Sequence, residues 1–427
     1  MTRNQQTIPD AANQYDRRLL LRMTAAGGIT AAGIVSGMRN HAFAQEATPV
    51  AQASPIAGQQ YAYVGADSRT AIENGADPET TGISVFAVNP ADGALSRVQT
   101  VKSDNPFFFA FDPTKTFLYG VNVIADYEGD SGIVEAYAID PATGALTFIN
   151  RQASGGGAAC HLSVDPSGRY VVVANYSGGN FTVLPINEDG SLEPVISTVT
   201  PEGSGPNEAR QEQSHPHAVL YDPAGKFIAA ADLGTDTVHI FRLNLDTGEL
   251  EEVSQAKTAP GAGPRHVAFN ADATLLYVIG ELDATITIFT YDSATGALGE
   301  VIQTISTVPE PFDGTKSTAE IFIHQSGKFL YSSNRGQPDS TTPEGDAIVA
   351  FSIDPGTGEL TLIGHMMEDI AEPQSFGFDA TGAWLYAANY RGDSVTQYAI
   401  DQETGELTNL HMPVETPWPY VIVMSEP

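Results

Sequence analysis

This 427-residue chain contains a repeated segment, and five polar residues lie next to its apolar runs in different copies. Their side chains could carry acid–base chemistry. His217 and Arg265 each stand just before an apolar run, in SHPHAVLYD and GAGPRHVAFN. Glu320 precedes another such run, whereas Glu281 and Arg335 each follow one. An imidazole can take a proton near neutral pH. A guanidinium can stabilise an oxyanion, so these residues would form a site if the fold brought them together.

The elements that must position them come from two repeated patterns. A turn of the form x-G-x-L occurs seven times, and its Gly suits a tight turn that needs positive φ. The second pattern is an apolar strand, a polar turn and another apolar strand. Its six copies are FDPTKTFLYGVN (from Phe111), VDPSGRYVVVAN (Val164), YDPAGKFIAAAD (Tyr221), FNADATLLYVIG (Phe269), IHQSGKFLYSSN (Ile323) and FDATGAWLYAAN (Phe378).

A seventh copy of the second pattern is divided between the ends of the repeat region. WPYVIVMS (418–425) supplies its first strand and YAYVGAD (61–67) supplies its second. A unit of about fifty residues with four short strands, repeated seven times, predicts an all-β, seven-bladed β-propeller. In it the N- and C-terminal strands share one blade and close the ring. An array of β-sandwiches would not explain the divided copy.

Propeller geometry predicts where the polar residues meet. The first strand of each blade lines the channel and the second runs antiparallel to it. The start of the first strand and the end of the second therefore lie at one end of the ring, so the five residues should converge on one mouth. His215, His161, Tyr176 and Arg391 are further candidates there. The alternative is that these polar groups are only solvated or paired with each other in a wet channel.

The segments RQEQSHPHAVLYDPAGKF, GAGPRHVAFN, AEIFIHQSGKFLYSSNRG and CHLSVDPSGRYVVVANYSGG resemble the lactonase family of seven-bladed propellers, over roughly residues 59–427. That family includes cytoplasmic 6-phosphogluconolactonases and a fungal carboxymuconate cyclase. The resemblance implies a catalytic set of His217, Arg265 and Glu281, with Arg335 as the family's later arginine. The chain departs from the family at Gln374, where relatives often carry arginine.

The resemblance implies hydrolysis of a small lactone without a metal or other cofactor. His217 would be the general base, Arg265 would stabilise the oxyanion, and Glu281 would orient these groups or transfer a proton. The remaining candidates would contact substrate: Arg335, Glu320, His215, His161, Tyr176 and Arg391. His215 and His217 could offer two ligands to zinc, but no Cys pair or H-E-x-x-H motif accompanies them. Two alternatives stay open, a lactone-forming cycloisomerase and a secreted propeller that only binds.

The N-terminal segment predicts export. Residues 1–44 read as a signal peptide of the twin-arginine type, with Arg17 and Arg18 ahead of an Ala/Gly-rich stretch and a cleavage site after Ala44. Residues 45–58 read as a linker and 59–427 as the propeller. Export makes an unphosphorylated sugar lactone the expected substrate.

The net charge and composition limit the classes of molecule that this chain can bind. The formal net charge is −32, and removing the signal, with five basic and two acidic residues, leaves −35. Such a chain is unsuited to nucleic acid or anionic membranes. No apolar run beyond the signal could span a membrane, and the single cysteine, Cys160, forms no internal disulfide. We expect a monomer, because a closed ring leaves no sheet edge to pair.

Overall fold

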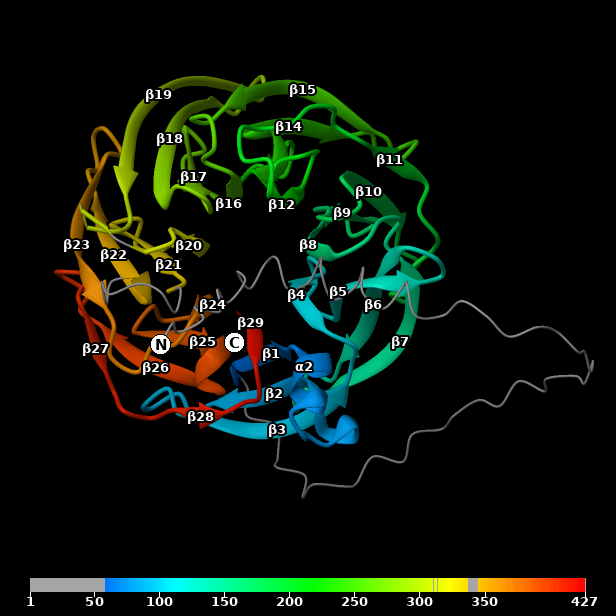
Figure 1. Cartoon of the computed structure of the whole chain (residues 1–427). Coiled ribbons are helices and arrows are strands. Elements are labelled where there is room, and N and C mark those ends of the chain that lie inside the picture. Colours follow the sequence, from blue (N-terminus) through cyan, green and yellow to red (C-terminus); the bar gives the residue numbers. More distant parts are fainter. Residues whose placement is uncertain (1–57, 310, 313, 337–344, 427) are drawn as a thin grey trace, which may run out of the picture. The chain divides into compact units, whose positions relative to one another are not determined.

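The computed structural model describes residues 58–426 except 310, 313 and 337–344. The predicted signal (1–44) and all but the last residue of the predicted linker lie outside the described residues. The propeller region contains seven antiparallel sheets arranged as the blades of a ring around a central channel (Figure 1). The predicted seven-bladed β-propeller is confirmed.

Each blade runs from an inner strand beside the channel to an outer strand at the rim (Figure 1). The strands are, in blade 1, β29 (Pro419–Met424), β1 (Tyr61–Ala66), β2 (Gly82–Val88) and β3 (Leu95–Lys102); in blade 2, β4 (Pro106–Phe111), β5 (Phe117–Tyr127), β6 (Ser131–Ile139) and β7 (Leu146–Ala153); in blade 3, β8 (Ala159–Val164), β9 (Tyr170–Asn175), β10 (Asn180–Pro185) and β11 (Ser197–Val199); and in blade 4, β12 (Pro216–Tyr221), β13 (Ile228–Asp232), β14 (Thr237–Leu243) and β15 (Leu250–Lys257).

The other three blades follow the same order. Their strands are, in blade 5, β16 (Pro264–Phe269), β17 (Leu275–Gly280), β18 (Thr285–Asp292) and β19 (Ala297–Ser306); in blade 6, β20 (Thr318–Ile323), β21 (Phe329–Asn334), β22 (Ala347–Ile353) and β23 (Leu360–Met366); and in blade 7, β24 (Pro373–Phe378), β25 (Trp384–Asn389), β26 (Ser394–Ile400), β27 (Leu407–Asn409) and β28 (Val414–Glu415). Short helical segments are α2 (Ser68–Glu73), η1 (Pro78–Thr80), η2 (Leu233–Thr235) and η4 (Tyr390–Gly392). No helix among the described residues is long and apolar enough to cross a membrane.

The ring closes as the divided repeat predicts. β29 pairs antiparallel with β1, with Tyr63 opposite Val423 and Val64 opposite Ile422. Strands from both ends of the propeller therefore share blade 1.

The hydrophobic core is distributed around the ring. Seven clusters of buried side chains each span two neighbouring blades. The last of these joins blade 7 to blade 1 through residues such as Tyr386 and Ile422. Each blade is therefore stabilised mainly by burial against its two neighbours.

The x-G-x-L turns join the third and fourth strands of each blade and contact a neighbouring blade. Their seven glycines all have φ between +68° and +83°, as the turn chemistry predicts. In five blades a buried tyrosine of the second strand donates its hydroxyl hydrogen to such a glycine's carbonyl in the next blade. These pairs are Tyr63–Gly144, Tyr119–Gly190, Tyr277–Gly358, Tyr331–Gly405 and Tyr386–Gly93.

A β-bulge recurs near the start of the inner strand in every blade. In β12, Pro216 pairs with Asp232 and Ala218 pairs with Ala231, so His217 is the extra residue. Arg265 is the extra residue of β16 in the same way. The register shifts at the matching point of the other inner strands. A bulge changes the direction of a side chain, so two consecutive residues can face the channel mouth.

Candidate active site

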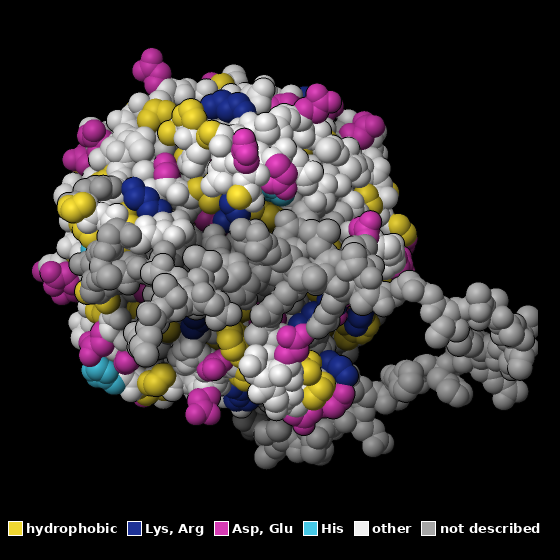
Figure 2. Space-filling view, in the orientation of Figure 1, with side chains coloured by type: hydrophobic (Ala, Val, Ile, Leu, Met, Phe, Trp, Pro, Cys, Tyr) yellow, Lys and Arg dark blue, Asp and Glu magenta, His cyan; other side chains and the backbone are white. Residues whose placement is uncertain are grey.

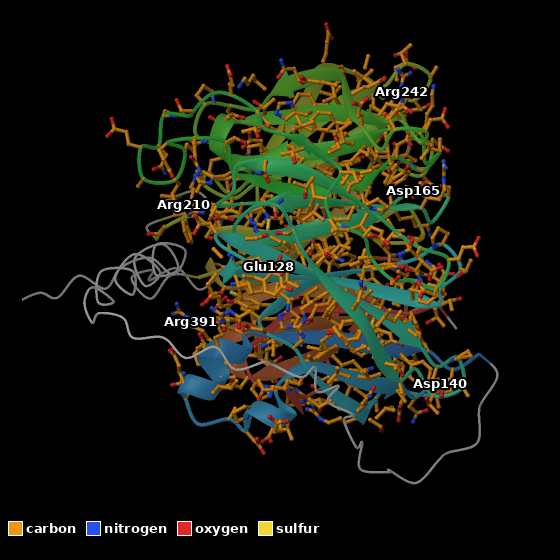
Figure 3. All side chains as sticks on the ribbon, turned by 90° about the vertical axis from the view of Figure 1, so that its right-hand side faces the viewer. Glu128, Asp140, Asp165, Arg210, Arg242 and Arg391 are labelled. Atoms are coloured by element: carbon orange, nitrogen blue, oxygen red, sulfur yellow. The ribbon has the colours of Figure 1, made fainter. Side chains whose placement is uncertain are left out.

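The predicted residues meet at one end of the channel, which we call the mouth. They come from the bulged starts of the inner strands and from the residues that follow the second strands. Figure 3 shows the two ends of the ring in side view: Arg210 and Arg391 lie at the mouth, and Asp140 and Asp165 lie at the opposite end. The predicted convergence of His217, Arg265, Glu281, Glu320 and Arg335 is confirmed by their contacts.

Glu281 is the centre of this arrangement, because three arginines surround its carboxylate. Arg210 Nη2 lies 2.6 Å from Oε1, while Arg265 Nε and Arg335 Nη2 each lie 3.0 Å from Oε2. Burial alone would favour the protonated acid, but Arg335, Arg210 and Arg265 outweigh it and hold the pKa of Glu281 well below its usual range. Glu281 is therefore an ionised acceptor at neutral pH.

Three arginines carry more positive charge than the single carboxylate of Glu281 can neutralise. This excess affects the ionisation of the arginines themselves. Burial and the nearby charge of Arg335 lower the pKa of Arg265 to about 10, against the opposing effect of Glu281 and Glu320. Burial works in the same direction on Arg210, but Glu281 and Tyr176 raise its pKa above the ordinary value. Arg210 and Arg265 therefore remain cations at neutral pH. The cluster thus leaves positive charge available to a ligand.

His217 lies beside this cluster with its ring nitrogens weakly engaged. Nε2 is 3.9 Å from Glu281 Oε2, and Nδ1 is 3.9 Å from the Cys160 sulfur. Burial, then the charges of Arg265 and His266, hold the pKa of His217 well below its usual value. The imidazole is therefore neutral at pH 7 and able to accept a proton. Burial also raises the pKa of the Cys160 thiol to about 12, so this thiol is unsuited to nucleophilic attack.

A second histidine, His266, joins Arg265 to Glu320. Its Nε2 lies 3.2 Å from Arg265 Nη1, and its Nδ1 lies 2.6 Å from Glu320 Oε1. Arg265 also donates through Nη1 to the carbonyl of Ala319, at 2.7 Å. Among the described residues, Nη2 of Arg265 makes no hydrogen bond. That N–H group can reach a ligand.

The other predicted contacts divide into those near this cluster and those at its edge. His161 stacks on Phe108 at 3.8 Å and meets His266 edge-on at 5.1 Å, below the arginines. His215 stacks on Tyr176 at 4.5 Å, and Tyr176 in turn meets His217 edge-on. Both ring nitrogens of His215 are engaged, by the Tyr176 carbonyl and by Glu212.

Arg391 stands apart from Glu281. Its side chain is 41% exposed and pairs with Glu372. Gln374 joins this pair to the cluster, because it binds Glu372 at 3.2 Å and accepts from Arg335 Nη1 at 3.2 Å. Position 374 therefore holds an amide that bridges the two groups of charges.

Sequence reasoning missed Arg210 and His266 as members of the site. Arg210 lies on the connection before β12, outside both repeated patterns, so no alignment of the copies could identify it. Its loop is fixed by Gln211, which is fully buried and donates to the Leu233 carbonyl and to Asp236. His266 directly follows Arg265, and on a regular strand the two side chains would face opposite ways.

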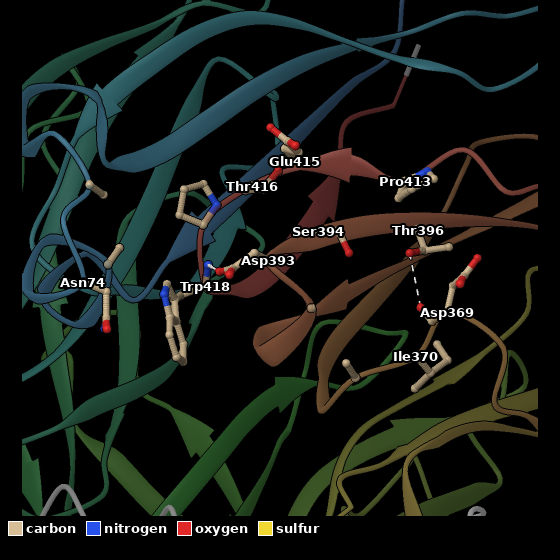
Figure 4. Close-up of a pocket in the computed structure, with 15 residues that line it drawn as sticks. Asn74, Asp369, Ile370, Asp393, Ser394, Thr396, Pro413, Glu415, Thr416 and Trp418 are labelled. Atoms are coloured by element: carbon tan, nitrogen blue, oxygen red, sulfur yellow. Dashed lines mark hydrogen bonds between the residues drawn. The ribbon is translucent and has the colours of Figure 1, made fainter.

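The open groove of about 900 Å³ shown in Figure 4 lies elsewhere on the propeller. Its lining includes Asp369, Asp393, Glu415 and Trp418, none of which belongs to the arginine cluster. We therefore place the candidate site by its contacts. Among the described residues, no group of three or more His, Cys, Asp or Glu side chains has the arrangement of a metal site.

This fold and mouth define a propeller that holds a buried carboxylate among arginines and histidines. A sequence model of the family described as "Lactonase, 7-bladed beta-propeller" matches residues 62–424. The chain is 35% identical to a 6-phosphogluconolactonase of Bacillus subtilis over 342 residues, 80% of this chain and 93% of that one. It is 33% identical to a 6-phosphogluconolactonase of Formosa agariphila over 313 residues, 72% of this chain and 85% of that one.

Solved structures give the same result. A periplasmic gluconolactonase of Pseudomonas aeruginosa superposes with a TM-score of 0.78 at 28% identity, covering 86% of this chain and 100% of that one. The protein belongs to the lactonase family of seven-bladed β-propellers.

Proposed function

We propose that the protein hydrolyses the ester bond of a small lactone at the mouth, with His217, Arg265 and Glu281 as its catalytic residues. The observation that carries the proposal is the buried Glu281 with three arginines, 3.9 Å from a neutral His217. The names of the relatives, gluconolactonase and 6-phosphogluconolactonase, support the same reaction class.

In the proposed mechanism His217 removes a proton from water as that water attacks the lactone carbonyl. The carbonyl oxygen becomes an oxyanion, which the free Nη2 of Arg265 stabilises. The ring C–O bond then breaks, and the leaving alkoxide takes the proton back from His217. The product is a hydroxy acid, which ionises and releases one proton to solution.

Glu281 has the orienting role in this scheme. Its oxygens accept hydrogen bonds from Arg210 and Arg265, and its low pKa makes it a poor proton donor at neutral pH. Of the two roles considered for it, orientation is therefore favoured over proton transfer.

Arg335 is proposed to bind the substrate. Its side chain is 13% exposed beside Glu281, so part of the guanidinium can contact a ligand oxygen. The excess of three arginines over Glu281 favours a substrate that carries negative charge, such as a phosphorylated lactone, whereas export favours an unphosphorylated one. The two substrates are therefore compared directly in the test below. Arg391, His215, His161 and Tyr176 remain proposed contacts around it.

The test is proton release in a pH-stat with glucono-1,5-lactone and its 6-phosphate, with and without EDTA. We expect turnover that persists in EDTA and falls on the order of 10²- to 10⁴-fold in His217→Ala. His411→Ala, which changes a histidine with a 65% exposed side chain, serves as the matched control. Absence of turnover on every lactone, or an unchanged rate in His217→Ala, would overturn the proposal.

We also propose that the protein is exported through its twin-arginine-type signal. The support is the segment around Arg17 and Arg18 and the similarity to a gluconolactonase named as periplasmic. In a bacterial host with a twin-arginine translocase, the exported form should begin at Gln45 by mass spectrometry. Replacing both arginines by lysine should retain the uncut chain in the cytoplasm, and export of that variant would contradict the proposal.

A further inference from the structure

The lactonase mechanism above leaves one buried titratable pair unused. His266 of blade 5 and Glu320 of blade 6 are 4% and 2% exposed, and their side chains meet at 2.6 Å. The backbone N–H of Ile321 donates to Glu320 Oε1 at 3.2 Å. Ser375 of blade 7 lies 3.5 Å from Oε2. Three blades thus fix a carboxylate beneath His266.

The position of the histidine proton follows from these contacts. A guanidinium only donates hydrogen bonds, so His266 Nε2, at 3.2 Å from Arg265 Nη1, must be the acceptor. The ring proton therefore lies on Nδ1 and is donated to Glu320 Oε1. This tautomer satisfies all three residues with a single proton in the pair.

These contacts fix the orientation of the Arg265 guanidinium. Its Nε is held by Glu281, and its Nη1 is held by His266 and by the Ala319 carbonyl. Nη2 remains for the reacting oxygen. We propose that His266 and Glu320 are positioning residues, which aim Arg265 while the imidazole is neutral with its proton on Nδ1 and Glu320 is ionised. This inference rests on the proposed role of Arg265 in lactone hydrolysis.

Protonation of the imidazole would remove this acceptor, because it places an N–H group and a positive charge against Arg265 Nη1 at the 3.2 Å contact. Protonation of Glu320 has a milder effect. With the proton on Oε2, Oε1 still accepts from Nδ1, but this hydrogen bond loses its charged acceptor and holds the ring less firmly.

The surroundings set the pH at which this happens. The pair is faced by His161 from β8, His217 from β12, Glu281 after β17 and Arg335 after β21. Burial raises the pKa of Glu320 to about 7, although Arg265 and His161 oppose the shift. Glu320 therefore takes up a proton near neutral pH, which weakens its hold on His266, and kcat/KM should fall on the acid side.

Two substitutions separate positioning from simple support of the fold. In Glu320→Gln the amide oxygen can still accept from Nδ1 but is neutral at every pH, so the acid limb of kcat/KM that Glu320 causes should disappear. Glu320→Met removes the acceptor and should lower kcat by roughly ten- to a hundredfold, with a smaller change in KM. Glu135→Met, which changes an equally buried glutamate of blade 2, should leave the acid limb unmoved.

A ¹⁵N NMR spectrum of histidine-labelled protein tests the tautomer without any substrate. The wild type should show a His266 signal with the proton on Nδ1, assigned by its loss in His266→Gln. A proton on Nε2, or an acid limb identical in wild type and Glu320→Gln, would overturn the inference. If no lactone is hydrolysed, the proposed function fails, whereas the NMR result still decides the tautomer.

Discussion

At the scale of single residues, Glu281 is the group on which the site depends. One buried carboxylate neutralises part of the charge of three arginines, of which Arg265 is almost fully buried and the other two are 13% exposed. Removing one member of a buried ionic group leaves the others unpaired in a region of low dielectric constant. The same residue is thus expected to matter for folding and for catalysis.

We predict that Glu281→Gln lowers the free energy of unfolding by about 3–5 kcal/mol at pH 7, measured by urea denaturation. Because the folded pKa of Glu281 is lowered, its contribution is fully present above the unfolded pKa of about 4.3 and declines as the pH falls below it. The difference in the free energy of unfolding between wild type and Glu281→Gln should therefore become smaller at acid pH. Glu251→Gln, in an exposed pair with Arg242, should change the free energy of unfolding far less. Equal losses in the two variants would contradict this account of Glu281.

Arg210 gives a second prediction at this scale. Its loop carries a charged donor to the mouth, 2.6 Å from Glu281 and 3.2 Å from the Tyr176 hydroxyl. Arg210→Ala should raise KM for a phosphorylated lactone by on the order of tenfold or more, and raise it less for the neutral lactone. Steady-state kinetics on both substrates, with Arg242→Ala as control, measure this. An equal change in KM for the two substrates would show that Arg210 does not distinguish substrates by their charge.

At the scale of elements, the bulge in each inner strand sets the direction of the site side chains. The fold and the mouth could be predicted from the sequence, because the repeats fix which strand ends meet. The bulge itself could not, since an extra residue in one strand leaves no mark in the hydrophobic pattern. His161 and Glu320 occupy the same repeat position as His266 and were predicted, so the same comparison of the copies could have identified His266.

The segment that leads into β12 is also tightly constrained. A Cβ atom on Gly234, in η2, would lie 1.9 Å from the Gln213 carbonyl oxygen and 2.7 Å from the His215 nitrogen. Gly234→Ala should therefore displace the chain before His217, cost about 1–3 kcal/mol of stability and lower kcat/KM. Thermal unfolding and kinetics check this.

Gly364→Ala in β23 is the matched control, because its Cβ would meet nothing within 4 Å. A Gly234→Ala variant as stable and active as Gly364→Ala would contradict the predicted clash.

At the scale of the whole propeller, closure of blade 1 joins the two ends of the ring. Acidic side chains are spread over the visible rim of the ring in Figure 2. The formal net charge of −32 favours mutual repulsion between copies. We propose a monomer in solution, which light scattering after size-exclusion chromatography would test.

Deleting residues 418–427 removes β29, and with it the partner of β1 and part of the cluster between blades 7 and 1. We expect the midpoint of thermal unfolding to fall by on the order of 10 °C or more, and the exposed edge of β1 to promote aggregation. Deleting only residues 426 and 427 removes the exposed Glu426 and should change neither property. A truncated protein that remains monomeric and as stable as this control would contradict closure by β29.

The measurement that most directly tests the central claim is kcat/KM for lactone hydrolysis in wild type and Arg265→Gln, by pH-stat at pH 7. If Arg265 stabilises the oxyanion, kcat/KM falls by on the order of 10²- to 10³-fold, while Arg242→Gln stays at the wild-type value. A value for Arg265→Gln within about threefold of wild type, which corresponds to less than about 1 kcal/mol, would contradict the account.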